Sequence, residues 1–479
     1  MRFLISFLSV ILVALSQCHR SLAVETEGIP ETSLKVPPMG PEKSISTYLP
    51  SPTAPGQGLA VNVIYPTRTR YKEGAPVVVV ASGGEAASGL EFSTHASQSG
   101  FAEVRFAFPG GGKAGFASSG TYDFRGPASQ QALRDVLLFA AGKKVDAQGR
   151  TINKLVPAKL YNSTVGLIGW SNGGNIALIT LAKAASQLNF VGWMAFYETP
   201  LGSMFFPPAL GGASDFVQNK HYREGSAATG KPLVDYRKLA YQAVGQKNIG
   251  MHKKLGQPEI SGVLFFDENG NKLWEEDTEF AFPYASYTGL NKQIYPPAVT
   301  QAMQRVGLFK EGWPSTVATL PESQKYFDER DGSTYLSDLA KARPDLLVTV
   351  VGSQLDHLQR QPDNPHIPLN YNGWLSNRLK FVRLNPDPVY VGAVSGMNLA
   401  NFRNNKPNSS IDASDINAYL EPEGLVPDYI YIESAIAELS DRRKANNYKR
   451  TLEAPIVMYF NGALPSLDKN SAPIENRLK

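Results

Sequence analysis

Apolar runs of strand length alternate with runs of helical spacing over the first part of the chain. The continuous β-branched run APVVVVASGG (75–84) is typical of a strand covered on both faces, and VGLIGW (165–170) and FVGWMAFYETP (190–200) are similar. Apolar positions recur at helical spacing in PASQQALRDVLLFAAGKK (127–144) and NIALITLAKAASQL (175–188). This alternation predicts βαβ units, and therefore an α/β fold with a mainly parallel central sheet flanked by helices.

The alternation stops in the middle of the chain, where residues 201–344 are aromatic and proline-rich without sustained periodicity. It resumes with DLLVTVVGSQLDHLQ (345–359), and LKFVRLNPDPVYV (379–391) is expected to be the last strand. We therefore expect a large insertion or cap between a strand ending near Pro200 and a strand starting near Asp345. The insertion divides the core into residues 44–200 and 345–464.

Three features of the less regular segments give further expectations. FFDENGNKLW (265–274) is expected to form a hairpin around Asn269-Gly270. Ser414 to Leu420 and Ile430 to Asn446 have helix-like patterns. Several aromatic residues of the insertion are candidates for lining a pocket, although such residues are more often plain core: Phe205, Phe206, Trp274, Phe282, Tyr284 and Tyr287.

The chain begins with the layout of a secretory signal peptide, residues 1–23, in which Arg2 precedes an apolar run and small residues end at Ala23. The run is too short for a comfortable membrane span, so we expect no stable membrane insertion. Residues 24–43 are expected to be a flexible lead-in, and residues 465–479 a disordered tail.

Secretion or export to a periplasm is therefore the expected destination. Cys18, the only cysteine, lies in the signal, and Leu15 to Cys18 faintly resembles a lipoprotein cleavage box. Gln17 fits that box poorly, so lipid attachment is not favoured. Cleavage after Ala23 would leave a protein without disulfides or a thiolate nucleophile.

The formal net charge is only +4 and charged residues are 19%, so the sequence gives no basic surface strong enough to argue for nucleic acid. A small or uncharged partner is expected instead. The sequons at Asn162 and Asn408 are meaningful only in a eukaryotic secretory route.

Gly169-Trp170-Ser171-Asn172-Gly173 lies between the strand-like and helix-like runs and has the pattern of a nucleophile elbow. A serine raised above a strand end needs a strained turn, and glycine belongs two positions before and after it, where a side chain would collide with neighbouring backbone. The unpaired N–H groups of the following helix face the serine. These features favour acyl transfer on Ser171 over a turn with an idle serine.

With this elbow, the chain resembles the α/β-hydrolase superfamily of secreted esterases and serine-peptidase-like hydrolases, over about Ser44 to Asp387. The resemblance implies an α/β-hydrolase fold and a catalytic triad with Ser171 as nucleophile. It implies an oxyanion hole formed by the N–H groups of Asn172 and of Gly84 or Glu85, although Gly83-Gly84 could also be an ordinary strand-end turn.

The resemblance also implies an acid after a late strand. The acid is expected to be Asp356, in a turn that resembles the family's with one residue extra. Glu198 is the alternative acid because its strand ends at the same edge.

The histidine departs from the family pattern, which takes it from the loop after the last strand, because no histidine follows Asp387. We expect His366, in a proline-rich loop, to be the base. His357 is the alternative, although it adjoins Asp356 and neighbouring side chains point apart.

The expected function is a secreted serine hydrolase that cleaves carboxylic esters, small or polymeric, through an acyl-enzyme on Ser171, without a cofactor or a metal. A peptidase or amidase of the same fold is the nearest alternative. A second alternative is a catalytically weak α/β-hydrolase scaffold that acts as an exported binding protein, which the unusual histidine position would favour.

Overall fold

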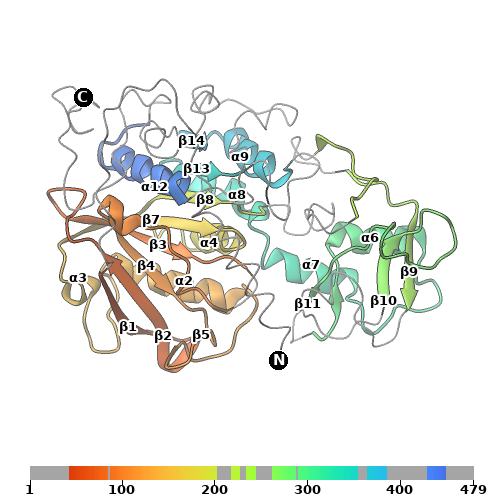
Figure 1. The fold of residues 1–479 in the computed structure, drawn as a ribbon, viewed down its shortest axis with the longest axis horizontal. Coiled ribbons are helices and arrows are strands. Elements are labelled where there is room, and N and C mark those ends of the chain that lie inside the picture. Colours follow the sequence, from red (N-terminus) through yellow and green to blue (C-terminus); the bar gives the residue numbers. More distant parts are fainter. Residues whose placement is uncertain are drawn as a thin grey trace, which may run out of the picture.

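The computed structural model describes residues 43–84, 87–201, 217–226, 233–243, 262–286, 290–353, 356, 364–385 and 429–448. Its main feature is an eight-stranded sheet in the order β1-β2-β4-β3-β7-β8-β13-β14 (Figure 1). The strands are β1 (Lys43–Ser51), β2 (Ala54–Tyr65), β3 (Ala75–Ala81), β4 (Ala102–Phe106), β7 (Leu160–Trp170), β8 (Val191–Tyr197), β13 (Leu347–Val351) and β14 (Phe381–Leu384).

The sheet is parallel from β4 through β3, β7, β8 and β13 to β14. At the other edge, β2 pairs antiparallel with both β1 and β4. The mainly parallel α/β sheet predicted from the sequence is therefore confirmed. The sequence pattern did not predict β1, because KSISTYLPS is an edge strand with four exposed positions and no apolar run.

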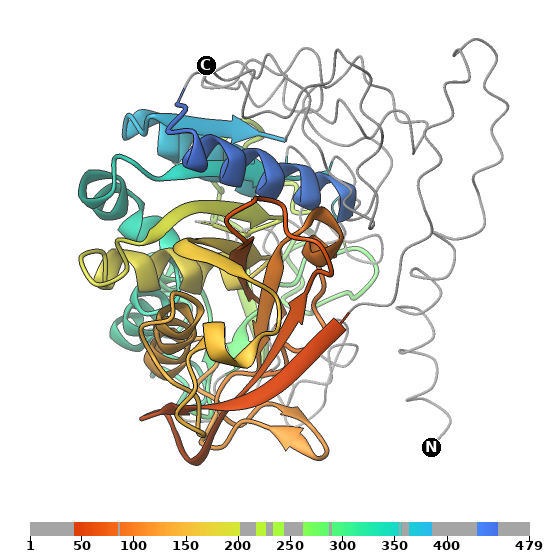
Figure 2. The ribbon, with the colours of Figure 1, turned by 90° about the vertical axis from the view of Figure 1, so that its left-hand side faces the viewer.

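Both faces of the sheet are covered, as the unbroken apolar strands require. Val79 of β3 packs in a cluster with α2, α4, α8 and α9, whereas its neighbour Val78 packs in a cluster with α12. Figure 2 shows α12, the dark blue helix, lying against the sheet. The helices are α2 (Pro127–Ala140), α3 (Ile152–Leu155), α4 (Gly173–Lys183), α6 (Pro297–Val306), α7 (Leu320–Asp328), α8 (Leu336–Ala342), α9 (His366–Ser376), α12 (Tyr429–Lys444) and the 3₁₀ turns η1 (Ala96–Ser99) and η4 (Gly332–Tyr335).

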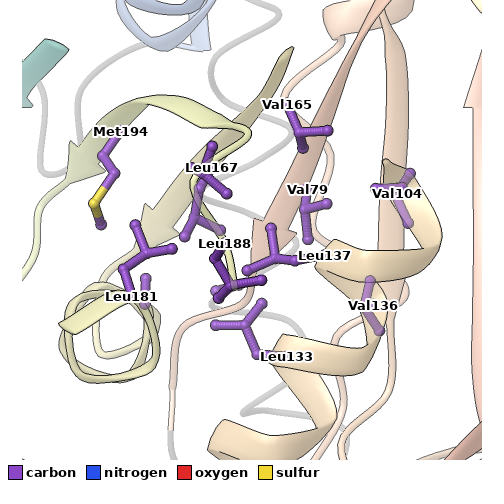
Figure 3. Close-up of a cluster of buried hydrophobic side chains, with 14 of the residues drawn as sticks. Val79, Val104, Leu133, Val136, Leu137, Val165, Leu167, Leu181, Leu188 and Met194 are labelled. Carbon is purple, nitrogen blue, oxygen red and sulfur yellow. The ribbon is translucent and has the colours of Figure 1, made fainter. Parts of the chain in front are cut away.

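The larger of the two clusters packs between the strands and the helices on either side of the turn at Ser171. Leu133 and Leu137 of α2 and Leu181 of α4 meet Val79 and Leu167 of the central strands, and all five side chains are buried (Figure 3). Burial of aliphatic side chains of this size contributes about 1.5–3 kcal/mol each. The helix after the elbow is therefore anchored by its packing as well as by its hydrogen bonds.

Between β8 and β13 the chain forms short sheets, with β9 beside β10 and β11 beside β12, together with α6 and α7 (Figure 1). Their aromatic side chains, including Phe282 and Tyr284, build a separate core. Helix α8, in contrast, packs in the main core. The short strands are β5 (Gly112–Lys113), β6 (Phe116–Ala117), β9 (Leu239–Ala243), β10 (Gly262–Phe266), β11 (Ala285–Ser286) and β12 (Gln293–Ile294).

The chain turns at Asn269-Gly270, but the tight hairpin predicted within residues 265–274 is wrong. Residues 271–274 form no strand; β10 pairs with β9, and beyond the turn an isolated antiparallel bridge joins Phe265 to Ala281. The turn itself is present, with Gly270 at φ 80° and the Asp267 carboxylate accepting from the Gly270 N–H at 2.7 Å. The carboxylate closes the turn locally, and the chain returns to β10 only farther on, where the Phe266 N–H donates to the Phe280 carbonyl and the Phe282 N–H donates to the Leu264 carbonyl.

The predicted helix near the C-terminus is confirmed by α12 (Tyr429–Lys444). Several predictions fall on residues outside the described ones: the predicted signal peptide, the predicted tail, the predicted helix from Ser414 to Leu420, and the pocket candidates Phe205, Phe206 and Tyr287. Within the part of the chain that the structure describes, no helix has both the length and the apolar character needed to cross a membrane.

Candidate active site

Ser171 stands between the end of β7 and the start of α4 with φ 47°, in the left-handed region. A side chain in that region costs roughly 1–2 kcal/mol, and such strain persists only where the surroundings impose it. Here the Ser171 N–H donates to the Tyr197 carbonyl (2.7 Å) and the Ser171 carbonyl accepts from the Gly174 N–H (2.9 Å). The serine is half-exposed.

The two glycines of the elbow are required by close backbone contacts. A Cβ on Gly169 would lie 2.4 Å from the Gly174 Cα, and one on Gly173 would lie 2.0 Å from the Ala81 carbonyl oxygen. Backbone cannot yield as a flexible side chain can, so no larger residue fits at either position. The steric requirement predicted for the motif is present in the structure.

The loop after β3 lies directly against the serine. A Cβ on Gly83 would come within 2.7 Å of the Ser171 Cβ, and Gly84 is exposed with φ 71°. Asn172 begins the turn into α4. Of the residues expected to donate to an oxyanion, Asn172 follows the serine in the chain and Gly84 follows the glycine that contacts it, whereas Glu85 lies outside the described residues.

A buried histidine and two carboxyls gather at the next strand ends. His366 is the first residue of α9, and its Nε2 lies 2.9 Å from Oε2 of Glu198, which follows β8. Ligand atoms of Glu198, Asp356 and His366 all lie within 4.8 Å of one another. The Ser353 N–H donates to Oε1 of Glu198 (2.5 Å).

Burial and the charge of the neighbouring Asp356 carboxylate raise the pKa of Glu198 well above its ordinary value, and the Ser353 N–H opposes that rise. Two carboxyls this close do not readily ionise together. The pair therefore favours a single negative charge beside the imidazole.

Two carboxylates and an imidazole are also a donor set for a divalent cation. The 2.9 Å contact between Glu198 and His366 accounts for their arrangement as a hydrogen-bonded acid–histidine pair.

Of the residues predicted from the sequence, the structure brings His366 together with both candidate acids. His366 makes its 2.9 Å contact with Glu198, the alternative acid. Ser171 is at the adjacent strand end, since its N–H bonds to the residue before Glu198. His357 lies outside the described residues.

Sequence reasoning missed Asn385, which follows β14 near the position where the superfamily takes its histidine. Its side chain accepts from the Gly352 N–H (2.9 Å) and donates to the Gly352 carbonyl (2.8 Å). These bonds fasten the ends of β13 and β14 to each other. Its position directly after an apolar strand was the only signal that could have found it.

The observations that decide the fold are the mostly parallel eight-stranded sheet and the strained serine between a strand and a helix. The chain has the α/β-hydrolase fold. No protein-family model and no curated protein matches the sequence.

Several solved structures are similar to this α/β-hydrolase-fold chain. A brefeldin A esterase, described as a bacterial homologue of human hormone-sensitive lipase, is 17% identical over 41% of this chain and 50% of its own, with a TM-score of 0.26. A bacterial heroin esterase is 17% identical over 34% and 45%, with a TM-score of 0.23. A hypothetical protein from Pseudomonas aeruginosa is 12% identical over 73% and 88%, with a TM-score of 0.32. The matched region spans about half the length of the two esterases.

The backbone conformation of Ser171 predicts an unusual order of stabilities. Glycine normally costs about 0.5–1 kcal/mol relative to alanine, but at a positive φ alanine bears the steric cost instead. We expect Ser171→Gly to unfold at a higher urea concentration than Ser171→Ala, by up to about 1 kcal/mol in the free energy of unfolding. The control is Ala182→Gly in α4, which should destabilise. A Ser171→Ala variant more stable than Ser171→Gly would contradict the strain.

The raised pKa of Glu198 predicts a pH dependence of stability. Below its ordinary pKa of 4.5 the group is protonated in the folded and the unfolded protein. As the pH rises from there, the unfolded state loses this proton first, so the contribution of the group to stability declines by up to about 1.4 kcal/mol per pH unit. Glu198→Gln cannot titrate, so its free energy of unfolding relative to wild type should increase with pH. A constant difference between pH 4 and pH 8 would contradict the assignment.

Proposed function

We propose that this protein is a serine hydrolase that cleaves carboxylic esters through an acyl-enzyme on Ser171. The observation that carries the proposal is the strained, half-buried serine, in a turn where Gly169 and Gly173 permit close backbone contacts and Gly83 of another segment lies against the serine itself. Strained non-glycine residues cluster at active sites. A serine nucleophile in this fold occupies such a strained strand-to-helix turn, which presents its Oγ to the substrate.

In the proposed reaction, His366 takes the Ser171 proton as Ser171 Oγ attacks the carbonyl carbon. Because His366 Nε2 contacts Glu198, the proposal assigns this proton to Nδ1. The negative charge shared by Asp356 and Glu198 stabilises the imidazolium that forms. The alcohol leaves with the proton from His366, and water then releases the acid by the same steps in reverse order.

The oxyanion of the tetrahedral intermediate is proposed to accept hydrogen bonds from the N–H groups of Asn172 and Gly84. The contact of Gly83 with Ser171 supports this role, because it holds the loop against the serine. Backbone donors fixed before the reaction need no reorganisation as charge develops. Carboxylic esters are the proposed substrates, small molecules or polymers, with amides or peptides as the alternative.

One observation favours a second function, that of a catalytically weak binding protein. His366 lies on α9, before the last strand, and its side chain is fully buried. For either function we propose export, supported by the signal-like residues 1–23.

The proposed nucleophile predicts covalent labelling. A fluorescent fluorophosphonate should label the wild-type protein, and Ser171→Ala should lose the label completely because the reacting oxygen is removed. Ser163→Ala, on the exposed part of β7, is a matched serine control that should label fully. Labelling is read from gel fluorescence. A wild-type protein that stays unlabelled would refute the esterase and favour the binding protein.

The proposed base predicts a difference between two histidines. In His366→Ala, the kcat for a p-nitrophenyl ester should fall by about 10³-fold or more, because Ser171 loses its proton acceptor. His357→Ala should keep the wild-type kcat. Circular dichroism of both variants checks that they are folded. Full activity in His366→Ala, or a larger loss of kcat in His357→Ala than in His366→Ala, would show that the triad has another base.

A further inference from the structure

Arg125 is a buried arginine, 1% exposed, that touches the loop beside Ser171. One terminal nitrogen, Nη2, donates to the carbonyl oxygens of Gly83 (2.6 Å) and Gly84 (3.1 Å). Its guanidinium lies 4.0 Å from the centre of the Phe108 ring, which adds a cation–π contact. A charged donor in a buried site holds carbonyls more strongly than a neutral donor does.

The hydrogen bonds from Arg125 fix the direction of the Gly84 N–H group. In a trans peptide the carbonyl of one residue and the N–H of the next point in opposite directions. Since the Gly83 carbonyl points to Arg125, the Gly84 N–H points away from Arg125. Gly84 itself has open space around its Cα, where an added Cβ would meet nothing within 4 Å. The Gly84 N–H is the group assigned above to the oxyanion.

The backbone that carries Arg125 is itself strained. Phe124 and Arg125 have φ 53° and 67°, two successive non-glycine residues in the left-handed region. Conformations of this kind cost about 1–3 kcal/mol each and need an external hold. This strained backbone places the Arg125 guanidinium against the Gly83 and Gly84 carbonyls.

Arg330, in the segment between β8 and β13, stabilises this strained backbone by hydrogen bonds. Its Nε donates to the Phe124 carbonyl and its Nη2 to the Asp123 carbonyl, both at 2.9 Å. Arg330 is 2% exposed and follows α7. The Glu329 carbonyl beside it accepts from Gln130 Nε2 of α2 (2.5 Å). The segment that contains α7 is therefore fastened to the strained turn.

We propose that Arg125 is a positioning residue that orients the Gly84 N–H for oxyanion binding, and that Arg330 acts through Arg125 from the segment after β8. The inference rests on the proposed hydrolase function. It makes the α7 segment, which is remote in sequence from the elbow, a part of the machinery that sets kcat. Neither arginine needs to touch the substrate.

The test is ester turnover by Arg125→Lys and Arg330→Gln in the full-length protein. Lysine keeps the charge, but its side chain is shorter and lacks the planar guanidinium that lies over the Phe108 ring. We expect kcat to fall about 10²-fold in Arg125→Lys and about 10-fold in Arg330→Gln, with KM within twofold of wild type. Affinity for a boronic acid, which mimics the tetrahedral intermediate, should fall in parallel with kcat. A purely structural role would not move kcat and this affinity together at constant KM.

The double variant tests the relay. If Arg330 acts through Arg125, then Arg125→Lys with Arg330→Gln should have the kcat of Arg125→Lys alone, and independent effects would multiply instead. Arg343→Gln is the matched control, because Arg343 is also buried and donates to the carbonyls of Leu188 (3.2 Å) and Val191 (2.7 Å), at the far end of the sheet. It should lower the thermal midpoint without changing kcat.

The outcomes separate this inference from the function on which it rests. A wild-type protein without labelling or turnover would overturn the proposed function. An active wild type with an Arg125→Lys kcat within twofold would overturn the positioning role alone. Multiplying effects in the double variant would overturn the relay. If Arg125→Lys fails to fold, Arg330→Gln decides, and an unchanged kcat in that variant overturns the proposal.

Discussion

The close approach of three backbone segments around Ser171 is the constraint on which the rest of the structure depends. The end of β7, the start of α4 and the loop after β3 meet at distances that exclude a Cβ on Gly169, Gly173 or Gly83. The strain at Ser171 is tolerated because α2 and α4 pack a large apolar core under these segments. The packing of the core therefore offsets the steric cost of the Ser171 conformation.

The same edge of the sheet gathers the other polar groups because the strands are parallel. Glu198 follows β8 with φ 45°, close to the φ of Ser171 on the neighbouring strand. Asn385 fastens the ends of β13 and β14, and the Ser353 N–H holds the Glu198 carboxyl. The contact between Ser353 and Glu198 joins residues that are 155 positions apart. The site is therefore a consequence of strand order.

The repeating strands and helices and the elbow could be predicted from the sequence because they depend on local patterns: apolar periodicity and glycine spacing. The contact between Glu198 and His366 could not, because the two residues are 168 positions apart and meet only after β8 and β13 pair. Arg125 was missed for a related reason. An arginine beside a glycine gives no sequence signal of burial, and its partners, Gly83 and Gly84, are contacted through backbone atoms.

The most direct measurement of the central claim is the mass of the acyl-enzyme. The protein is mixed with an activated ester, quenched in acid within milliseconds and analysed by intact mass and by peptide mapping. The account predicts a protein heavier by one acyl group, with the added mass on Ser171. An active protein with no adduct, or with the acyl group on another residue, would contradict it.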